Sequence, residues 1–116
     1  VVAAIERLSV RGAPAIGVAG AYGVALAAVL HPPSSSRVEF DAAVQNLRGA
    51  RPTAVNLALM VDRVSALAGE APAAMLAEAN RIRDEELAAS VAMGTNGADL
   101  VAELCGDRPV RAMTIC

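Results

Sequence analysis

Residues 12–30 carry no charge and have the sequence GAPAIGVAGAYGVALAAVL. Proline is favoured in the first turn of a helix, so Pro14 indicates that a helix starts there. Glycine recurs at every third position, as Gly17, Gly20 and Gly23, and glycine lets a neighbouring backbone approach closely. We therefore expect a helix over residues 14–30 at the centre of a mainly helical fold.

The same segment has about the length of a membrane span. A span needs about 20 strongly apolar residues, whereas this segment is rich in Ala and Gly rather than Leu. A signal peptide fits poorly, because eleven residues that include Glu6 precede the segment and no clear cleavage site follows it. The composition favours a buried core helix and predicts no association with a membrane.

Two arginines stand beside rigid turns that precede predicted helices. Arg11 begins the motif RGAPAIG, and Arg51 begins RPTA about forty residues later. A guanidinium suits bidentate capture of phosphate or carboxylate, and the free N–H groups at a helix start favour the same ligands. One anionic small molecule held between the two corners is one interpretation; two ordinary loops with solvated arginines is the other.

Composition restricts the function classes. The chain has 116 residues, enough for one domain with a core, and it is 55% hydrophobic but only 2% aromatic. All ten basic residues are arginine and the net charge is -2. The use of arginine alone is typical of a GC-rich coding bias, so any single arginine is weaker evidence for a binding site. Without a basic cluster or an aromatic platform, binding to nucleic acid is not expected.

The remaining sequence predicts more helices, over residues 1–9, 36–49, 53–67 and from 73 to either 87 or 104. Thr53 is the expected N-cap of the third of these, and Asn56 falls in its first turn, where its amide can bind a ligand or tie down the loop. In the second, the residues expected to face partly inward are Val38, Ala42, Val44 and Leu47. In the last, a charged stripe is expected to be solvated, namely Glu78, Arg81, Asp84 and Glu85.

Cysteine and histidine give little sign of a metal site. The chain has two cysteines, Cys105 and Cys116, and one histidine, His31. Their spacing matches no zinc motif, and His31 falls at a predicted helix end, where a solvated histidine is common. A disulfide framework is equally unexpected, which predicts a reducing, cytoplasmic location.

The two ends suggest a piece of a longer protein. The first residue is Val, and residues 110–116 have the pattern of a strand that lacks a sheet to join. We expect an N-terminal helical domain over residues 1–104, and a turn and first strand of a second domain over residues 105–116.

Several motifs in this order resemble the S-methyl-5-thioribose-1-phosphate isomerases of methionine salvage. The most specific are VRGAPAIG from Val10 and RPTAVNL from Arg51; AYG from Ala21, GxxGAxL from Gly94 and the closing MTIC also match. The resemblance covers nearly the whole chain. It implies a mainly α fragment here, followed in the complete protein by a Rossmann-like α/β domain that this chain almost entirely lacks.

The resemblance also implies an activity and site residues. The family isomerises 5-methylthioribose 1-phosphate to 5-methylthioribulose 1-phosphate without a metal or nucleotide cofactor, as a homodimer. Arg11, Gly12 and Ala13 match its substrate-binding loop, Arg51 matches a second substrate-binding arginine, and Cys116 matches its active-site cysteine. Its catalytic aspartate would lie beyond Cys116, so we expect this chain alone to be inactive.

Three alternatives stay open. Ribose-1,5-bisphosphate isomerases share the architecture and would use similar arginine corners. Regulatory subunits of a translation-initiation guanine-nucleotide exchange factor use the same scaffold without catalysis. If the motifs mislead, the chain is a helical interaction module without a ligand. The intact arginine motifs and the terminal cysteine favour the methylthioribose enzyme.

Overall fold

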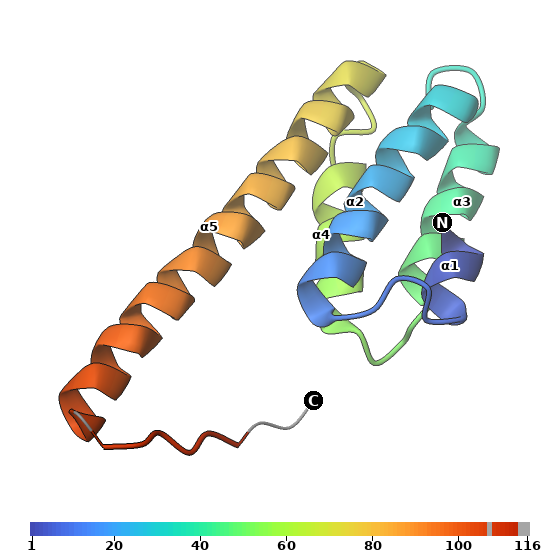
Figure 1. The fold of residues 1–116 in the computed structure, drawn as a ribbon. Coiled ribbons are helices and arrows are strands. Elements are labelled where there is room, and N and C mark those ends of the chain that lie inside the picture. The colour runs from blue at the N-terminus through green and yellow to red at the C-terminus, as the bar shows by residue number, and fades with distance from the viewer. Residues whose placement is uncertain (107, 114–116) are drawn as a thin grey trace. The chain divides into compact units, whose positions relative to one another are not determined.

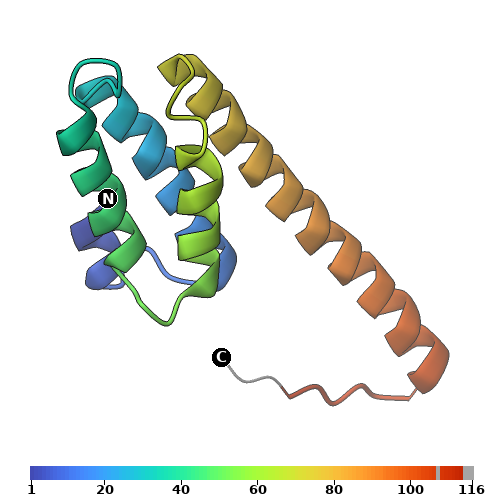
Figure 2. The same ribbon diagram turned by 180° about the vertical axis from the view of Figure 1, so that it is seen from behind.

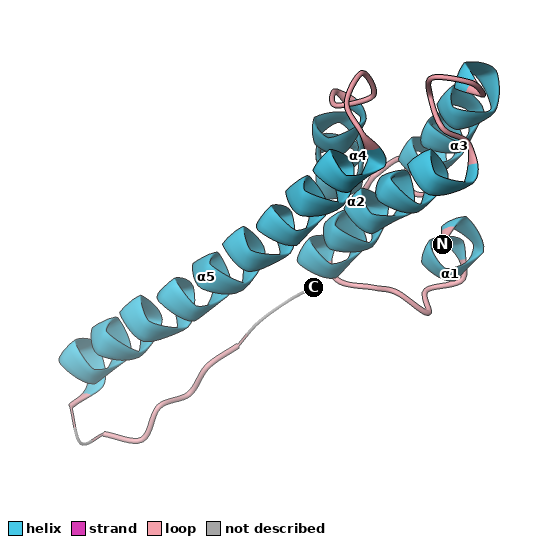
Figure 3. Ribbon diagram, turned by 90° about the horizontal axis from the view of Figure 1, so that it is seen from above, coloured by secondary structure: helices cyan, strands magenta, loops and turns pink. Residues whose placement is uncertain are grey.

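The computed structural model describes residues 1–106 and 108–113, and its ordered elements are helices (Figure 1). In chain order these helices are α1 (Val2–Glu6), α2 (Ala13–Leu30), α3 (Arg37–Gly49), α4 (Val55–Ser65) and α5 (Pro72–Cys105). No strand occurs within the described residues (Figure 3). The mainly α fold expected for this chain is confirmed.

The chain divides into two compact units, Val1–Asp84 and Glu85–Cys116. The division falls inside α5, whereas the helix itself ends at Cys105, next to the domain boundary expected after residue 104. That boundary stays a prediction. The first unit contains α1 to α4 and the first part of α5, and it holds the core.

Helix α2 is central to the first unit. It packs against both α3 and α4, which also contact each other. Figures 1 and 2 show that α2 and α4 run in the same direction while α3 runs the opposite way. The buried hydrophobic residues come from every helix of the unit: Ile5; Ile16, Ala21, Val24, Ala25, Ala27, Ala28; Phe40, Val44, Leu47; Leu57, Val61, Val64; Met75, Ala79, Ile82.

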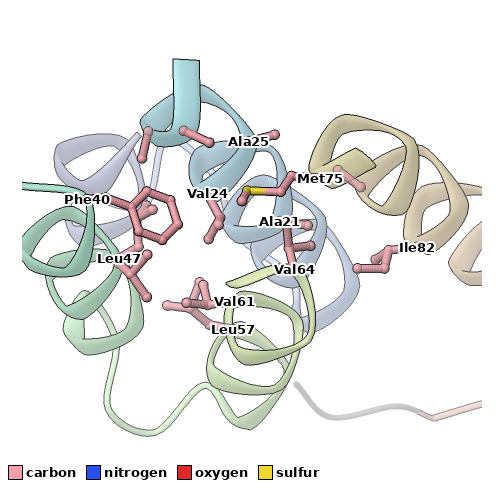
Figure 4. Close-up of a cluster of buried hydrophobic side chains, with 14 of the residues drawn as sticks. Ala21, Val24, Ala25, Phe40, Leu47, Leu57, Val61, Val64, Met75 and Ile82 are labelled. Carbon is pink, nitrogen blue, oxygen red and sulfur yellow. The ribbon is translucent and has the colours of Figure 1, made fainter. Parts of the chain in front are cut away.

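Glycine brings α2 close to its neighbours, as the spacing of the glycines predicted. A Cβ built on Gly20 would lie 2.6 Å from Leu57 Cδ1, and one built on Gly23 would lie 2.8 Å from Leu47 Cδ2. Leu47 and Phe40 of α3 point into the same space as Val24 of α2 (Figure 4). Small residues on α2 therefore make room for the larger side chains of α3 and α4.

By length and composition alone α2 is long and apolar enough to cross a membrane, and within the described residues it is the one such helix. Half of it is buried inside the protein. This burial agrees with the core helix that the sequence predicts.

Burial on α3 differs from the expected pattern. Val44 and Leu47 are buried as predicted, but Val38 is 78% exposed and Ala42 is exposed. The buried residue in the first turns of α3 is Phe40. Positions 40, 44 and 47 lie on one helix face, whereas 38 and 42 lie on another, so the predicted set mixed two faces.

The C-terminal segment shows no strand where it is described. Residues 108–113 have no regular secondary structure, although a strand was expected over residues 110–116. Thr114, Ile115 and Cys116 lie outside the described residues. A strand needs a partner to complete its backbone hydrogen bonds, and the described part of this chain offers none.

Candidate anion-binding site

The first arginine corner is shaped by Gly12. This residue is the N-cap of α2 and has φ +94°, a conformation that residues with a side chain rarely adopt. Its carbonyl oxygen accepts a hydrogen bond from the Ile16 N–H at 2.9 Å, which starts the helix. Pro14 occupies the first turn. The N–H groups of Ala13 and Ala15 lie in the same turn, where a helix offers them no acceptor. Arg11 is exposed beside them.

The second corner is a turn over residues 51–54. The Ala54 N–H donates to the Arg51 carbonyl oxygen at 2.9 Å, and α4 follows directly at Val55. The N-cap of α4 is therefore Ala54, without a side-chain cap, and not Thr53 as expected. Thr53 lies within the turn, so its position cannot cap the helix. Arg51 is half-buried.

The parallel course of α2 and α4 brings the two corners to the same end of the unit, the lower end in Figure 1. A Cβ on Gly17, in the second turn of α2, would lie 3.2 Å from the backbone oxygen of Asn56, in the first turn of α4. The helix starts are thus in contact, and both present N–H groups and a positive dipole end toward the same side. Substrate binding by Arg11, Gly12, Ala13 and Arg51 remains a prediction.

Most arginines of the described chain already have partners, which sets Arg11 and Arg51 apart. Side-chain hydrogen bonds to protein acceptors occupy Arg7, Arg37, Arg48, Arg63, Arg81, Arg83 and Arg108. Arg11, Arg51 and Arg111 have no side-chain hydrogen bond or ion pair with any other residue that the structure describes. Within the first unit, the guanidinium groups available for a ligand are those of the two corners.

Arg48 shows the contrast, three residues before Arg51. Its guanidinium binds the Asp62 carboxylate at 2.8 and 3.1 Å, and this hydrogen bond, together with the charge of Asp62, raises the pKa of Arg48. An arginine already paired in this way offers little to a phosphate. The pairing also ties the end of α3 to α4.

Glu78 is a buried charge, although its sequence position predicted a solvated face. Its side chain is 8% exposed and accepts hydrogen bonds from Arg63 and Arg81. The expectation was right for Arg81, Asp84 and Glu85, which are exposed. It was wrong for Glu78, because this residue lies on the same stripe of α5 as the buried Met75, Ala79 and Ile82. That i, i+3, i+4, i+7 spacing was visible in the sequence.

Tyr22 links α2 to α5. Its hydroxyl donates to Asn80 Oδ1 at 2.7 Å and accepts from Arg83 Nη1 at 3.3 Å. The Asp84 carboxylate, through a hydrogen bond and its charge, raises the pKa of Arg83. Beside Tyr22 is an apolar groove of about 410 Å³, lined by side chains that include Leu26, Val29 and Leu76. No charged residue lines it, so it does not suit a phosphate.

The remaining candidate residues lie elsewhere. His31 is the C-cap of α2, at the opposite end of that helix from Gly12. Cys105 is a free, half-buried thiol at the end of α5. Cys116, the expected catalytic residue, lies outside the described residues. Among the described residues no cluster of three or more His, Cys, Asp or Glu is placed to hold a metal ion.

Comparison with known proteins gives several bacterial relatives. One from Nocardia farcinica, named "Probable bifunctional methylthioribose-1-phosphate isomerase/methylthioribulose-1-phosphate dehydratase", is 43% identical over all of this chain and 21% of its own length. Relatives named methylthioribose-1-phosphate isomerase include one from Anaeromyxobacter sp., 50% identical over 87% of this chain and 29% of its own length. Another, from Alcanivorax borkumensis, is 45% identical over 84% and 30% respectively.

The chain thus spans between about a fifth and a third of the length of these relatives. No solved structure matches it significantly. The initiation factor 2 subunit family matches residues 9–116, a range that includes both arginine corners. This chain belongs to the initiation factor 2 subunit family.

Proposed function

We propose that the complete protein containing this chain is an aldose–ketose isomerase that converts 5-methylthioribose 1-phosphate to 5-methylthioribulose 1-phosphate. Relatives with 43–50% identity carry the name of this isomerase. The family description alone fits a regulatory subunit equally well. The names of these similar relatives favour the enzyme.

One structural observation carries the proposal: the two arginines without protein partners in the first unit stand at the starts of two parallel, touching helices. A phosphate ester needs several donors arranged around one group. Arg11 and Arg51 would supply guanidinium donors, and Gly12 and Ala13 would supply backbone N–H groups. The open space beside Gly12, where a built Cβ meets no atom within 4 Å, leaves room for the ester.

The chemistry assigns a role to Cys116 in the same proposal. The phosphate on C1 blocks spontaneous ring opening, so the enzyme must help to open the ring before hydrogen moves from C2 to C1. A thiol paired with a carboxyl group in a dry pocket can supply the acid–base or polar help. The hydrogen then moves either by a cis-enediol proton relay or by a hydride shift.

The decisive experiment is an activity assay on the complete protein. We expect the protein to turn over 5-methylthioribose 1-phosphate, and to turn over ribose 1,5-bisphosphate much more weakly. NMR detection of the ketose product measures both reactions. Preference for the bisphosphate would favour the sister isomerase. Absence of turnover with both sugars would favour a regulatory subunit.

The proposal includes a homodimeric complete protein in the cytoplasm, as in the isomerases that its motifs resemble. Size-exclusion chromatography with light scattering checks the mass. A mass that fits one subunit would contradict the dimer. This chain alone, which spans 21–30% of the length of the named relatives, is expected to show no turnover.

A further inference from the structure

Gly17 lies where α2 and α4 touch nearest to the two arginine corners. It is buried, and a Cβ added to it would meet Met60 Cγ at 3.1 Å, the Asn56 backbone oxygen at 3.2 Å and Asn56 Cβ at 3.4 Å. Asn56 is the second residue of α4, directly after the turn that begins at Arg51. The contact therefore joins α2 to the backbone that carries the second corner.

The kind of neighbour distinguishes Gly17 from the next glycines on α2. Around Gly20 the nearest atoms are side-chain carbons of Leu57 and Val61, and around Gly23 they are side-chain carbons of Leu47 and Val1. Side-chain ends can change rotamer to make room. The Asn56 backbone oxygen cannot move unless the first turn of α4 moves with it.

We infer that Gly17 is a positioning residue, which sets the separation between the Arg11 and Arg51 corners by allowing the first turn of α4 to lie directly on α2. An alanine there would push the start of α4 away by a few tenths of an ångström. Arg51 would move with it, while Arg11 and Gly12 stay at the start of α2. An anion held between the corners would then lose part of its contacts. This inference rests on the proposed function.

The test compares Gly17→Ala with Gly23→Ala in the complete protein. Both changes add one methyl group to the same buried helix, but only the first meets backbone. We expect Gly17→Ala to raise KM for 5-methylthioribose 1-phosphate about 3- to 10-fold, since small displacements of positioning groups are costly. We expect Gly23→Ala to leave KM unchanged and both variants to keep most of their kcat.

A merely structural role would lower the folded fraction, and thus kcat, without moving KM. An unchanged KM in folded Gly17→Ala, or an equal rise in Gly23→Ala, would overturn the inference. If Gly17→Ala does not fold, Met60→Ala is compared with the double variant Gly17→Ala/Met60→Ala, which lacks the nearest side-chain contact. The higher KM is still expected in the double variant, and equal KM values would count against Gly17.

Failure of the proposed function is distinguishable. If the wild-type protein does not turn over 5-methylthioribose 1-phosphate, the proposed activity is wrong, and the same variants are compared by calorimetry with inorganic phosphate. Weaker phosphate binding in Gly17→Ala than in wild type and Gly23→Ala would still support the inference. Equal dissociation constants would refute it.

Discussion

Arg63 of α4 and Glu78 of α5 form an ion pair between a half-exposed guanidinium and a buried carboxylate, with 2.5 Å between Nε and Oε1. Arg81 binds the other carboxylate oxygen. A buried charge is tolerated when it is paired and hydrogen-bonded. The pair therefore holds the first part of α5 against α4, and its loss should lower the free energy of unfolding.

We expect Glu78→Gln to lower the free energy of unfolding by about 1–3 kcal/mol, because two charge-assisted hydrogen bonds are weakened at a buried site. Both arginines retain access to water, which limits the cost. Urea denaturation of the complete protein measures the change. Asp84→Asn is the control, since Asp84 pairs with Arg83 on the surface and exposed pairs contribute little. Equal effects would show that burial of Glu78 has no energetic role.

Arg51→Ala should weaken substrate binding about 10- to 150-fold, the loss of a charge-assisted contact of roughly 1.5–3 kcal/mol. Calorimetry of the complete protein with 5-methylthioribose 1-phosphate measures it. The matched control is Arg37→Ala, because Arg37 is already paired with Asp41 and begins α3. Unchanged affinity in Arg51→Ala would remove Arg51 from the proposed site.

Gly12→Ala should be destabilising through backbone strain alone. The φ of +94° disfavours any side chain, at a cost of about 1–3 kcal/mol, although the space beside the residue is open. Gly49→Ala also enters open space, but at a position without positive φ, so we expect it to be neutral or slightly stabilising. Thermal unfolding compares the two. Similar melting temperatures would mean that the loop relaxes at no cost.

Cys116→Ser should reduce kcat about 10²- to 10⁴-fold if Cys116 acts as a positioned acid–base group, while KM changes little. Serine is close in size but far less acidic, so binding contacts survive. Cys105→Ser serves as control, because Cys105 has no proposed role. Near-normal turnover in Cys116→Ser would leave this cysteine a packing residue.

Local signals predicted the helices well. Pro14 placed the start of α2 within one residue of its observed position, Ala13, and α3 ends at Gly49 as expected. These signals act through the backbone of a few neighbouring residues, so a sequence displays them directly. The start of α4 was missed by two residues, because the backbone between Arg51 and Ala54 forms a turn instead of helix.

Features that depend on distant contacts were harder to predict. Nothing in the sequence states that α2 and α4 are parallel, and this is what brings Arg11 and Arg51 to one end. Likewise, Gly94 and Gly97 have the same three-residue spacing as the glycines of α2, but among the described residues no other part of the chain lies within 4 Å of a Cβ built on either of them. Their helix α5 is continuous through both. The spacing of glycines along a helix therefore does not predict whether, or where, another helix packs against them.

The hydrogen bond between Tyr22 and Asn80 has a spectroscopic consequence. The chain contains one tyrosine and no tryptophan, so its fluorescence on excitation in the tyrosine absorption band comes from a single phenol ring that joins the central helix to the first part of α5. Emission from this chain therefore reports on the surroundings of one side chain, whose hydroxyl contacts Asn80 and Arg83 of α5, rather than on an average over the fold. If α5 detaches while the other helices stay packed, the tyrosine emission should change. This movement can therefore be followed without a label.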